Sequence, residues 1–189
     1  MNNNITLILG PMRAGKSTEL LRRIQRCQAG ANKTLKRVLV IIPERDTRCD
    51  AAQIVTHDRD RSAPALRTAR LCDVLEQARQ QSNTVFVDEV QFFAADDVYE
   101  FALKLCATHE LVFVGLSGRF DLTPWPAVSV LLPLATDVHF LRAVCNRCGQ
   151  EATTTHLKGD ATQIGEDGVL INDSAYESLC LRCHRLATT

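Results

Sequence analysis

The chain has 189 residues, 46% of them hydrophobic and 23% charged, and its 22 basic and 22 acidic side chains cancel. This length and composition predict one sizeable buried core with room for a small appendage. The balanced charge argues against a polyanionic macromolecule as substrate. The N-terminus does not resemble a leader peptide, and no apolar run approaches the roughly 18 residues that span a bilayer. We therefore expect a cytoplasmic protein that binds neither nucleic acid nor a membrane.

The first predicted elements are a strand, a loop and a helix with a phosphate-binding pattern. The apolar run 5–9 precedes a G-x4-G-K-S segment, and a helical pattern follows over 17–28. Glycines let backbone N–H groups curl around phosphate oxygens, and the helix dipole favours an anion at its N-terminus. The lysine of this pattern reaches the β- and γ-phosphates, and the serine hydroxyl ligates Mg²⁺. The candidate residues for ATP and Mg²⁺ are Gly10, Pro11, Met12, Arg13, Ala14, Gly15, Lys16 and Ser17.

Further along the chain, strand-like and helical patterns alternate. Apolar runs at 37–42, 84–87 and 111–116 read as strands, and the patterns at 65–80 and 96–108 read as helices. This βαβ series predicts an α/β fold, a P-loop NTPase parallel sheet with helices on both faces. In such a sheet the ligand binds at the carboxyl edge of the strands. The residues that follow the predicted strands, and so meet at that edge, are Gly10, Pro43, Asp88 and Gly115.

The strand at 84–87 delivers two acidic residues, Asp88 and Glu89. An apolar strand that ends in a carboxylate is the Walker B pattern, in which the carboxylate holds Mg²⁺ directly or through water. Glu89 is then a candidate general base for an attacking hydroxyl or water. The alternative is a solvated loop. Phe92 and Phe93 follow, and they suit either the core or a stacking surface for a flat base.

Two C-x2-C pairs occur near the C-terminus. Four thiolates leave no open coordination position, so they predict a structural zinc site, although a redox dithiol or a chance pairing is the alternative. The 31 residues between the pairs exceed the usual spacing of about 15–20. The change of pattern predicts two domains, a nucleotide-binding domain at 1–142 and a zinc-binding lobe at 143–189. The predicted ligands are Cys145, Cys148, Cys180 and Cys183; His184 is adjacent, but four cysteines leave it no vacancy.

Taken in order, these motifs resemble the zinc-containing, type II thymidine kinase family of animals and bacteria. The resemblance implies transfer of the γ-phosphate of ATP to the 5′-hydroxyl of thymidine, and also of deoxyuridine, in nucleotide salvage. It covers nearly the whole chain. The motifs that carry it are Gly10-Pro11-Met12, Gly15-Lys16-Ser17-Thr18-Glu19-Leu20, Asp46-Thr47-Arg48, Thr56-His57-Asp58, Asp88-Glu89-x-Gln91-Phe92, Gly118-x-Phe120 and the two cysteine pairs.

The resemblance also implies roles for individual residues. Glu89 matches the catalytic base, Arg48 matches an arginine that neutralises the transferring phosphoryl group, and Asp46, Asp88 and Gln91 belong to the set around ATP and Mg²⁺. A lasso loop held by the zinc lobe would close over the nucleoside, mainly through backbone groups. The residues expected around thymidine are Phe92, Leu116, Phe120, Trp125, Ile171, Asn172 and Tyr176.

The chain departs from the family pattern at two places. Ser117 and Arg119 replace residues of the commoner Leu-Asp-Gly-Thr-Phe segment, and Ile171 and Asn172 stand where relatives usually carry a glycine pair. Since a bulky Ile171 adopts glycine's positive φ angles only at an energetic cost, we expect base specificity and substrate affinity to deviate here.

Regulation and assembly are also implied by the resemblance alone. It implies a homotetramer and feedback inhibition by thymidine triphosphate. Two other readings of the motifs are open: a P-loop ATPase in which Glu89 polarises water, and a zinc-ribbon nucleic-acid-binding NTPase. The ATPase would release phosphate without a nucleoside, and the nucleic-acid reader would bind single-stranded DNA in a salt-sensitive way. The basic residues of the knuckle region supply only part of the surface that the last reading needs; they are Arg147, Lys158, Arg182 and Arg185.

Overall fold

A six-stranded parallel sheet forms the centre of the protein in the computed structural model, which describes residues 4–29, 37–46, 52–55, 62–159 and 173–188. The strand order is β5-β2-β6-β7-β1-β8, and every pairing is parallel. The predicted parallel sheet is therefore confirmed. Its strands are β1 (Ile5–Gly10), β2 (Val38–Pro43), β5 (Leu66–Thr68), β6 (Thr84–Val87), β7 (Glu110–Leu116) and β8 (Asp137–Phe140).

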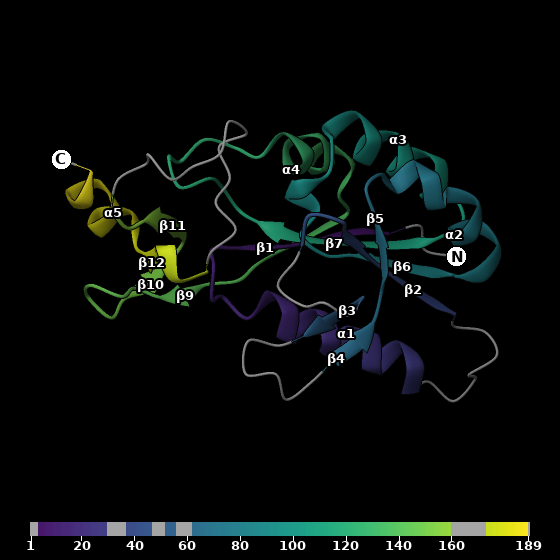
Figure 1. Cartoon of the computed structure of the whole chain (residues 1–189), viewed down its shortest axis with the longest axis horizontal. Helices are drawn as coiled ribbons and strands as arrows, with labels where there is room; N and C mark the ends of the chain where they lie inside the picture. Colours follow the sequence, from purple (N-terminus) through teal and green to yellow (C-terminus); the bar gives the residue numbers. More distant parts are fainter. Residues whose placement is uncertain (1–3, 30–36, 47–51, 56–61, 160–172, 189) are drawn as a thin grey trace.

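Helices cover both faces of this sheet (Figure 1). One face carries α2 (Leu75–Gln81), α3 (Ala95–Leu105) and α4 (Pro126–Leu131). The other carries α1 (Lys16–Ala29) and the small hairpin of β3 (Gln53–Val55) and β4 (Ser62–Pro64). Within the described ranges, no helix has the length and apolar character needed to cross a membrane. Short 3-10 turns complete the layer: η1 (Leu71–Val74), η2 (Val90–Phe92) and η3 (Leu132–Leu134).

The near-continuous apolar strands are explained by burial on both faces. Successive side chains of a strand point to opposite sides. Leu7 accordingly joins the cluster that contains Phe101 of α3, whereas its neighbour Ile8 joins the cluster of Leu20 and Ile24 on α1. All five side chains are fully or almost fully buried.

The predicted helix over 65–80 is wrong in its first half. There the chain forms β5, which pairs with β2, and then η1, and α2 begins only at Leu75. The buried carboxylate of Asp97, on α3, accepts hydrogen bonds from the N–H groups of Leu71 at 2.6 Å and Cys72 at 3.0 Å. This distant carboxylate takes the place of a local N-cap and sets the start of the helical turn, which local periodicity does not reveal.

A small lobe lies at one end of the molecule (Figure 1). It contains two antiparallel two-stranded sheets, β9–β10 and β11–β12, and the C-terminal helix. Its apolar cluster is formed by Ala143, Cys145, Ala152 and Leu179. The position of the domain boundary between residues 142 and 143 stays a prediction. The elements of the lobe are β9 (Ala143–Val144), β10 (Glu151–Ala152), β11 (Thr154–Leu157), η5 (Asp173–Ala175), β12 (Tyr176–Leu179) and α5 (Leu181–Ala187).

Candidate functional site

The predicted phosphate-binding loop runs from the end of β1 to the start of α1. A Cβ on Gly10 would lie 2.7 Å from the carbonyl oxygen of Leu141, so only glycine fits this close approach. Gly15 has a φ of 81° and Arg13 a φ of 60°, both in the left-handed region. The Gly15 carbonyl then accepts the N–H of Glu19 at 3.0 Å, which begins the helix. The loop thus has the tight, glycine-dependent path that its sequence predicts.

Lys16 reaches back across this loop. Its side chain is 9% exposed, and Nζ donates a hydrogen bond to the carbonyl oxygen of Pro11 at 2.8 Å. The ammonium group and the N-terminus of α1 therefore place positive charge on the same loop. This is the electrostatic arrangement that attracts a phosphate chain.

Glu19, in the first turn of α1, is engaged by its own helix. Its carboxylate accepts hydrogen bonds from Arg22 at 2.7 Å and Arg23 at 2.8 Å. The hydrogen bond from Arg22 is the main reason that the pKa of Glu19 falls to about 2, since burial acts in the opposite direction. Glu19 is thus ionised near neutral pH and supports the N-terminal turn of α1.

The two predicted carboxylates follow β6 and are buried. Asp88 is 3% exposed and Glu89 is 7% exposed. The Asp88 N–H donates to the carbonyl oxygen of Ile41 on β2 at 2.9 Å, and Asp88 Oδ1 accepts the Glu89 N–H at 2.9 Å. Glu89 has a φ of 49°, a left-handed conformation that is uncommon for a residue with a side chain. The backbone therefore turns sharply at Glu89.

Gln91 connects Glu89 to the end of β7. Its Nε2 donates to Glu89 Oε2 at 2.5 Å, and its Oε1 accepts the N–H of Leu116 at 3.1 Å. The adjacent Ser117 N–H donates to the Gly10 carbonyl oxygen at 3.2 Å. The ends of β6, β7 and β1 are thus joined, and the predicted meeting of these strand ends at one sheet edge is confirmed.

An aromatic cavity of about 370 Å³ opens beside Gln91. The rings of Phe92 and Trp125 lie edge to face, with centroids 6.3 Å apart, and the Arg119 guanidinium carbon is 4.8 Å from the Trp125 centroid. Trp125 Nε1 is buried without a hydrogen-bond partner among the described residues. Such walls suit a flat polar ring. The cavity is lined by Arg45, Gln91, Phe92, Phe93, Ala94, Ala95, Arg119, Trp125, Pro126 and Ala127.

The structure thus brings together only some of the predicted nucleoside residues. Phe92 and Trp125 line the cavity, whereas Leu116, Phe120 and Tyr176 are not among its lining residues. Leu116 is connected to the cavity through Gln91. Tyr176 is 8% exposed and lies on β12 in the small lobe.

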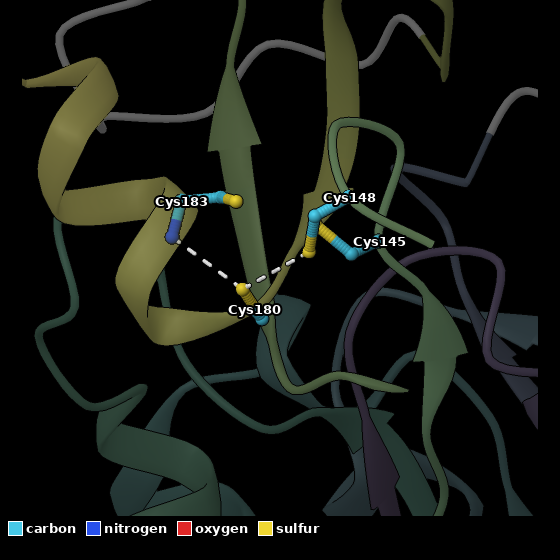
Figure 2. Close-up of side chains that lie close together, drawn as sticks. All are labelled: Cys145, Cys148, Cys180 and Cys183. Atoms are coloured by element: carbon cyan, nitrogen blue, oxygen red, sulfur yellow. Dashed lines mark hydrogen bonds between the residues drawn. The ribbon is translucent and has the colours of Figure 1, made fainter. Parts of the chain in front are cut away.

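The four paired cysteines converge in the small lobe, as Figure 2 shows. All four Sγ atoms lie within 4.8 Å of one another, and those of Cys148 and Cys180 are 3.7 Å apart. A tetrahedral zinc with Zn–S bonds of about 2.3 Å has S···S edges of about 3.8 Å. The Cys183 N–H also donates to Cys180 Sγ at 3.4 Å. The geometry therefore fits a structural zinc ion, as the sequence predicts.

The thiols of this cluster differ in pKa. Burial raises the pKa of Cys145, but hydrogen bonds from the backbone N–H groups of Cys180, Cys148 and Arg147 outweigh it and bring the pKa to about 6. The pKa of Cys183 rises to about 12, chiefly through its hydrogen bonds with Cys180 and Cys148. A cation bound by the cluster would displace the retained protons.

His184 is not part of this cluster. Its Nδ1 is 3.0 Å from Thr154 Oγ1, and the ring packs edge to face against His156. Burial lowers the pKa of His184, with a smaller contribution from His156. The four cysteines form the cluster without it.

Three predicted site residues, Arg48, Ile171 and Asn172, lie outside the described residues. Asp46 is described: its N–H donates to the Pro43 carbonyl oxygen at 3.1 Å, in the turn after β2. The roles assigned to all four stay predictions.

Sequence reasoning missed two hydroxyl residues of the small lobe that contact the phosphate-binding loop. Met12 N–H donates to Thr155 Oγ1, and Ser178 Oγ donates to the Met12 carbonyl oxygen. Thr and Ser are ordinary residues in short strands, so no local motif marks them. Their partner is 143 and 166 residues away along the chain.

Comparison with known proteins gives a consistent result over almost the whole chain. A family model described as "Thymidine kinase" matches residues 3–184. The chain is 36% identical to the thymidine kinase of Monkeypox virus and 35% identical to that of Vaccinia virus strain Western Reserve, in each case over 182 residues that cover 96% of both proteins. Among solved structures, the Legionella pneumophila ATPase DotB superposes with a TM-score of 0.42 at 17% identity, over 63% of this chain and 31% of that chain.

Proposed function

This chain belongs to the thymidine kinase family, and we propose that it transfers the γ-phosphate of ATP to the 5′-hydroxyl of thymidine or deoxyuridine. The observation that carries the proposal is the family match over residues 3–184, which includes both the phosphate-binding loop and the cysteine cluster. The aromatic cavity beside Gln91, which hydrogen-bonds to Glu89, supports a nucleoside as the acceptor.

The donor end of the reaction is assigned to the loop between β1 and α1. Backbone N–H groups of the loop beyond Met12 and the N-terminus of α1 bind the triphosphate, and Lys16 supplies charge to the β- and γ-phosphates. Asp88, 3% exposed at the end of β6, and the Ser17 hydroxyl offer hard oxygen ligands that suit Mg²⁺. When bound there, Mg²⁺ would neutralise charge on the phosphate oxygens.

Glu89 is assigned as the general base. Its carboxylate takes the proton of the 5′-hydroxyl while that oxygen attacks the γ-phosphorus and the bond to the bridging oxygen of ADP breaks. The hydrogen bond from Gln91 orients the carboxylate for this transfer. Arg48 is assigned to the developing phosphoryl charge. Positioning and charge neutralisation supply most of the acceleration in such reactions.

The acceptor base is assigned to the cavity with Phe92 and Trp125 on its walls. On family membership alone, we also assign Leu116, Phe120, Ile171, Asn172 and Tyr176 to nucleoside binding. Arg119 and Trp125 together shape this cavity, and they are the side chains on which we expect its preference among pyrimidines to depend.

One assay tests the proposal and separates it from the ATPase alternative. The purified, zinc-loaded protein is incubated with γ-labelled ATP, Mg²⁺ and each deoxynucleoside in turn, with a Lys16→Ala variant as the inactive control. Labelled thymidine and deoxyuridine 5′-monophosphates are expected. Equal release of labelled phosphate without nucleoside would instead identify an ATPase. No labelled product with either nucleoside would overturn the proposal.

We extend the proposal to assembly and regulation on family membership alone. A homotetramer predicts about four times the chain mass of 21.0 kDa by light scattering. Thymidine triphosphate as a feedback inhibitor predicts competition with substrate in the same kinase assay.

A further inference from the structure

The main chain of Met12, inside the phosphate-binding loop, is held on both sides by the small lobe. Its N–H donates to Thr155 Oγ1 at 3.1 Å, and its carbonyl oxygen accepts a hydrogen bond from Ser178 Oγ at 2.7 Å. Thr155 and Ser178 are directly opposite each other in the β11–β12 pairing and are 5% and 1% exposed. We call this pair of side chains the hydroxyl clamp.

The hydroxyl clamp is connected to the cysteine cluster. Asn146 lies between Cys145 and Cys148, and its Oδ1 accepts the Ser178 N–H at 2.8 Å. In return, the Asn146 N–H donates to the Ser178 carbonyl oxygen at 2.9 Å. Ser178 is therefore held by a residue whose own backbone would be ordered by zinc bound to Cys145 and Cys148, the predicted ligands on either side of it.

The loop held by the clamp has a strained backbone next to the clamped residue. Arg13 has a φ of 60°, and a non-glycine residue keeps such a conformation only where its surroundings enforce it. Residues 11–15 belong to no helix or strand. The clamp supplies a restraint immediately before Arg13, and it acts on the backbone that presents N–H groups to phosphate.

From this connection we propose that Thr155 and Ser178 are positioning residues, which hold the phosphate-binding loop in the shape that binds nucleotide, so that zinc in the small lobe raises nucleotide affinity. The inference rests on the proposed function, since it takes ATP as the ligand of the loop. The Met12 N–H already donates to Thr155 Oγ1, so it does not itself bind phosphate. The clamp therefore acts by fixing the backbone of Met12.

The test is a titration of the zinc-loaded protein with a non-hydrolysable ATP analogue and Mg²⁺, without nucleoside, followed by calorimetry. Thr155→Val keeps the side-chain shape but removes the acceptor, and Ser178→Ala removes the donor. A hydrogen bond of ordinary net strength predicts about 3- to 10-fold weaker binding in each variant. Thr155→Ser, which keeps the hydroxyl, is expected to restore most of the affinity.

Thr154→Val is the matched control within the same strand. The Thr154 hydroxyl donates to the Leu179 carbonyl oxygen at 2.8 Å, inside the lobe. Its removal is expected to lower the melting temperature while leaving analogue affinity within about twofold of wild type. Unchanged or tighter binding by both Thr155→Val and Ser178→Ala, with a lowered melting temperature, would mean that the clamp only stabilises the fold, and would overturn the proposal.

Zinc removal supplies the second arm. Chelation of the zinc is expected to weaken analogue binding by wild type about 3- to 10-fold. It should weaken binding by Ser178→Ala little further, since both changes act through the hydrogen bond from Ser178 Oγ to the Met12 carbonyl oxygen. Fully additive losses would contradict a connection through Ser178. If the zinc-loaded wild type does not bind the analogue at all, the proposed function itself fails, and this result is distinguishable from failure of the clamp.

Discussion

Replacing Gln91 gives the sharpest test of how the proposed base is held. Gln91→Met keeps the approximate volume but removes two buried hydrogen bonds, one to the Glu89 carboxylate and one from the Leu116 N–H. A hydrogen bond to a charged group contributes about 1.5–3 kcal/mol and a neutral one about 1 kcal/mol. We expect the free energy of unfolding to fall by about 3 kcal/mol, which for a chain of this length lowers the melting temperature by roughly 6–12 °C.

The same variant is expected to lose turnover as well as stability. Without the hydrogen bond from Gln91, the Glu89 carboxylate is held less firmly, and kcat for thymidine should fall by about 10- to 100-fold, because catalysis is sensitive to misplacement of a reacting group by about 1 Å. The KM for ATP should change little. Steady-state kinetics well below the lowered melting temperature separates this loss from unfolding.

Gln91→Glu is the matched partner of this variant. The new carboxylate still accepts the Leu116 N–H but faces Glu89 instead of donating to it. Two neighbouring carboxylates share a proton, which raises the upper pKa of the pair. In a plot of kcat against pH, the acidic limb should therefore move to higher pH by about one unit or more. Activity should recover as the pH rises. Wild-type turnover in Gln91→Met, together with an unmoved limb in Gln91→Glu, would refute the positioning of Glu89 by Gln91.

Three further predictions concern other residues. Glu89→Gln should slow turnover by about 10²- to 10⁴-fold with ATP-analogue affinity retained, and near-normal turnover would contradict its assignment as base. Gly115→Ala places a Cβ 2.7 Å from Gln91 Oε1, so urea unfolding should show a loss of about 1–3 kcal/mol, and an unchanged midpoint would show that the strand end yields easily. Cys72, whose pKa is raised to about 11 by burial and by its hydrogen bond with Asp97, stays a thiol at pH 8 and reacts faster only as pH approaches 11. Peptide mapping after iodoacetamide treatment at pH 8 should show alkylation at least about tenfold slower than that of a small-molecule thiol such as N-acetylcysteine treated in parallel, and equal rates would contradict the raised pKa.

The parts of the fold that the sequence predicts are those whose signal is local. A parallel strand buried on both faces is apolar at nearly every position, so β1, β2, β6 and β7 are visible as short runs. Glycine at the end of β1 and cysteines spaced by two residues mark a loop and a metal cluster, because each spacing is a geometric requirement of the site.

The missed parts depend on partners far along the chain. The helix start near Leu71 is set by Asp97, and the phosphate-binding loop is held by Thr155 and Ser178. The Asp88-Glu89-x-Gln91-Phe92 motif places Gln91 near the nucleotide. It does not reveal that the Gln91 amide bridges Glu89 and the end of β7. In each case the residue types are common ones, and only the three-dimensional pairing distinguishes them. The exposed edge strand β8 was missed for a different reason, since little of it is buried.

The left-handed backbone at Glu89 has a consequence for how this protein tolerates change. A side chain at a φ of 49° is less stable than glycine would be, typically by about 1 kcal/mol. Glycine at position 89 would relieve that strain, but it would also remove the acceptor of the buried hydrogen bond from Gln91, which contributes about 1.5–3 kcal/mol. The side chain that strains the backbone therefore also supplies the contact that offsets the strain. In the proposed base, the stability of the turn and the orientation of the carboxylate thus depend on one and the same hydrogen bond.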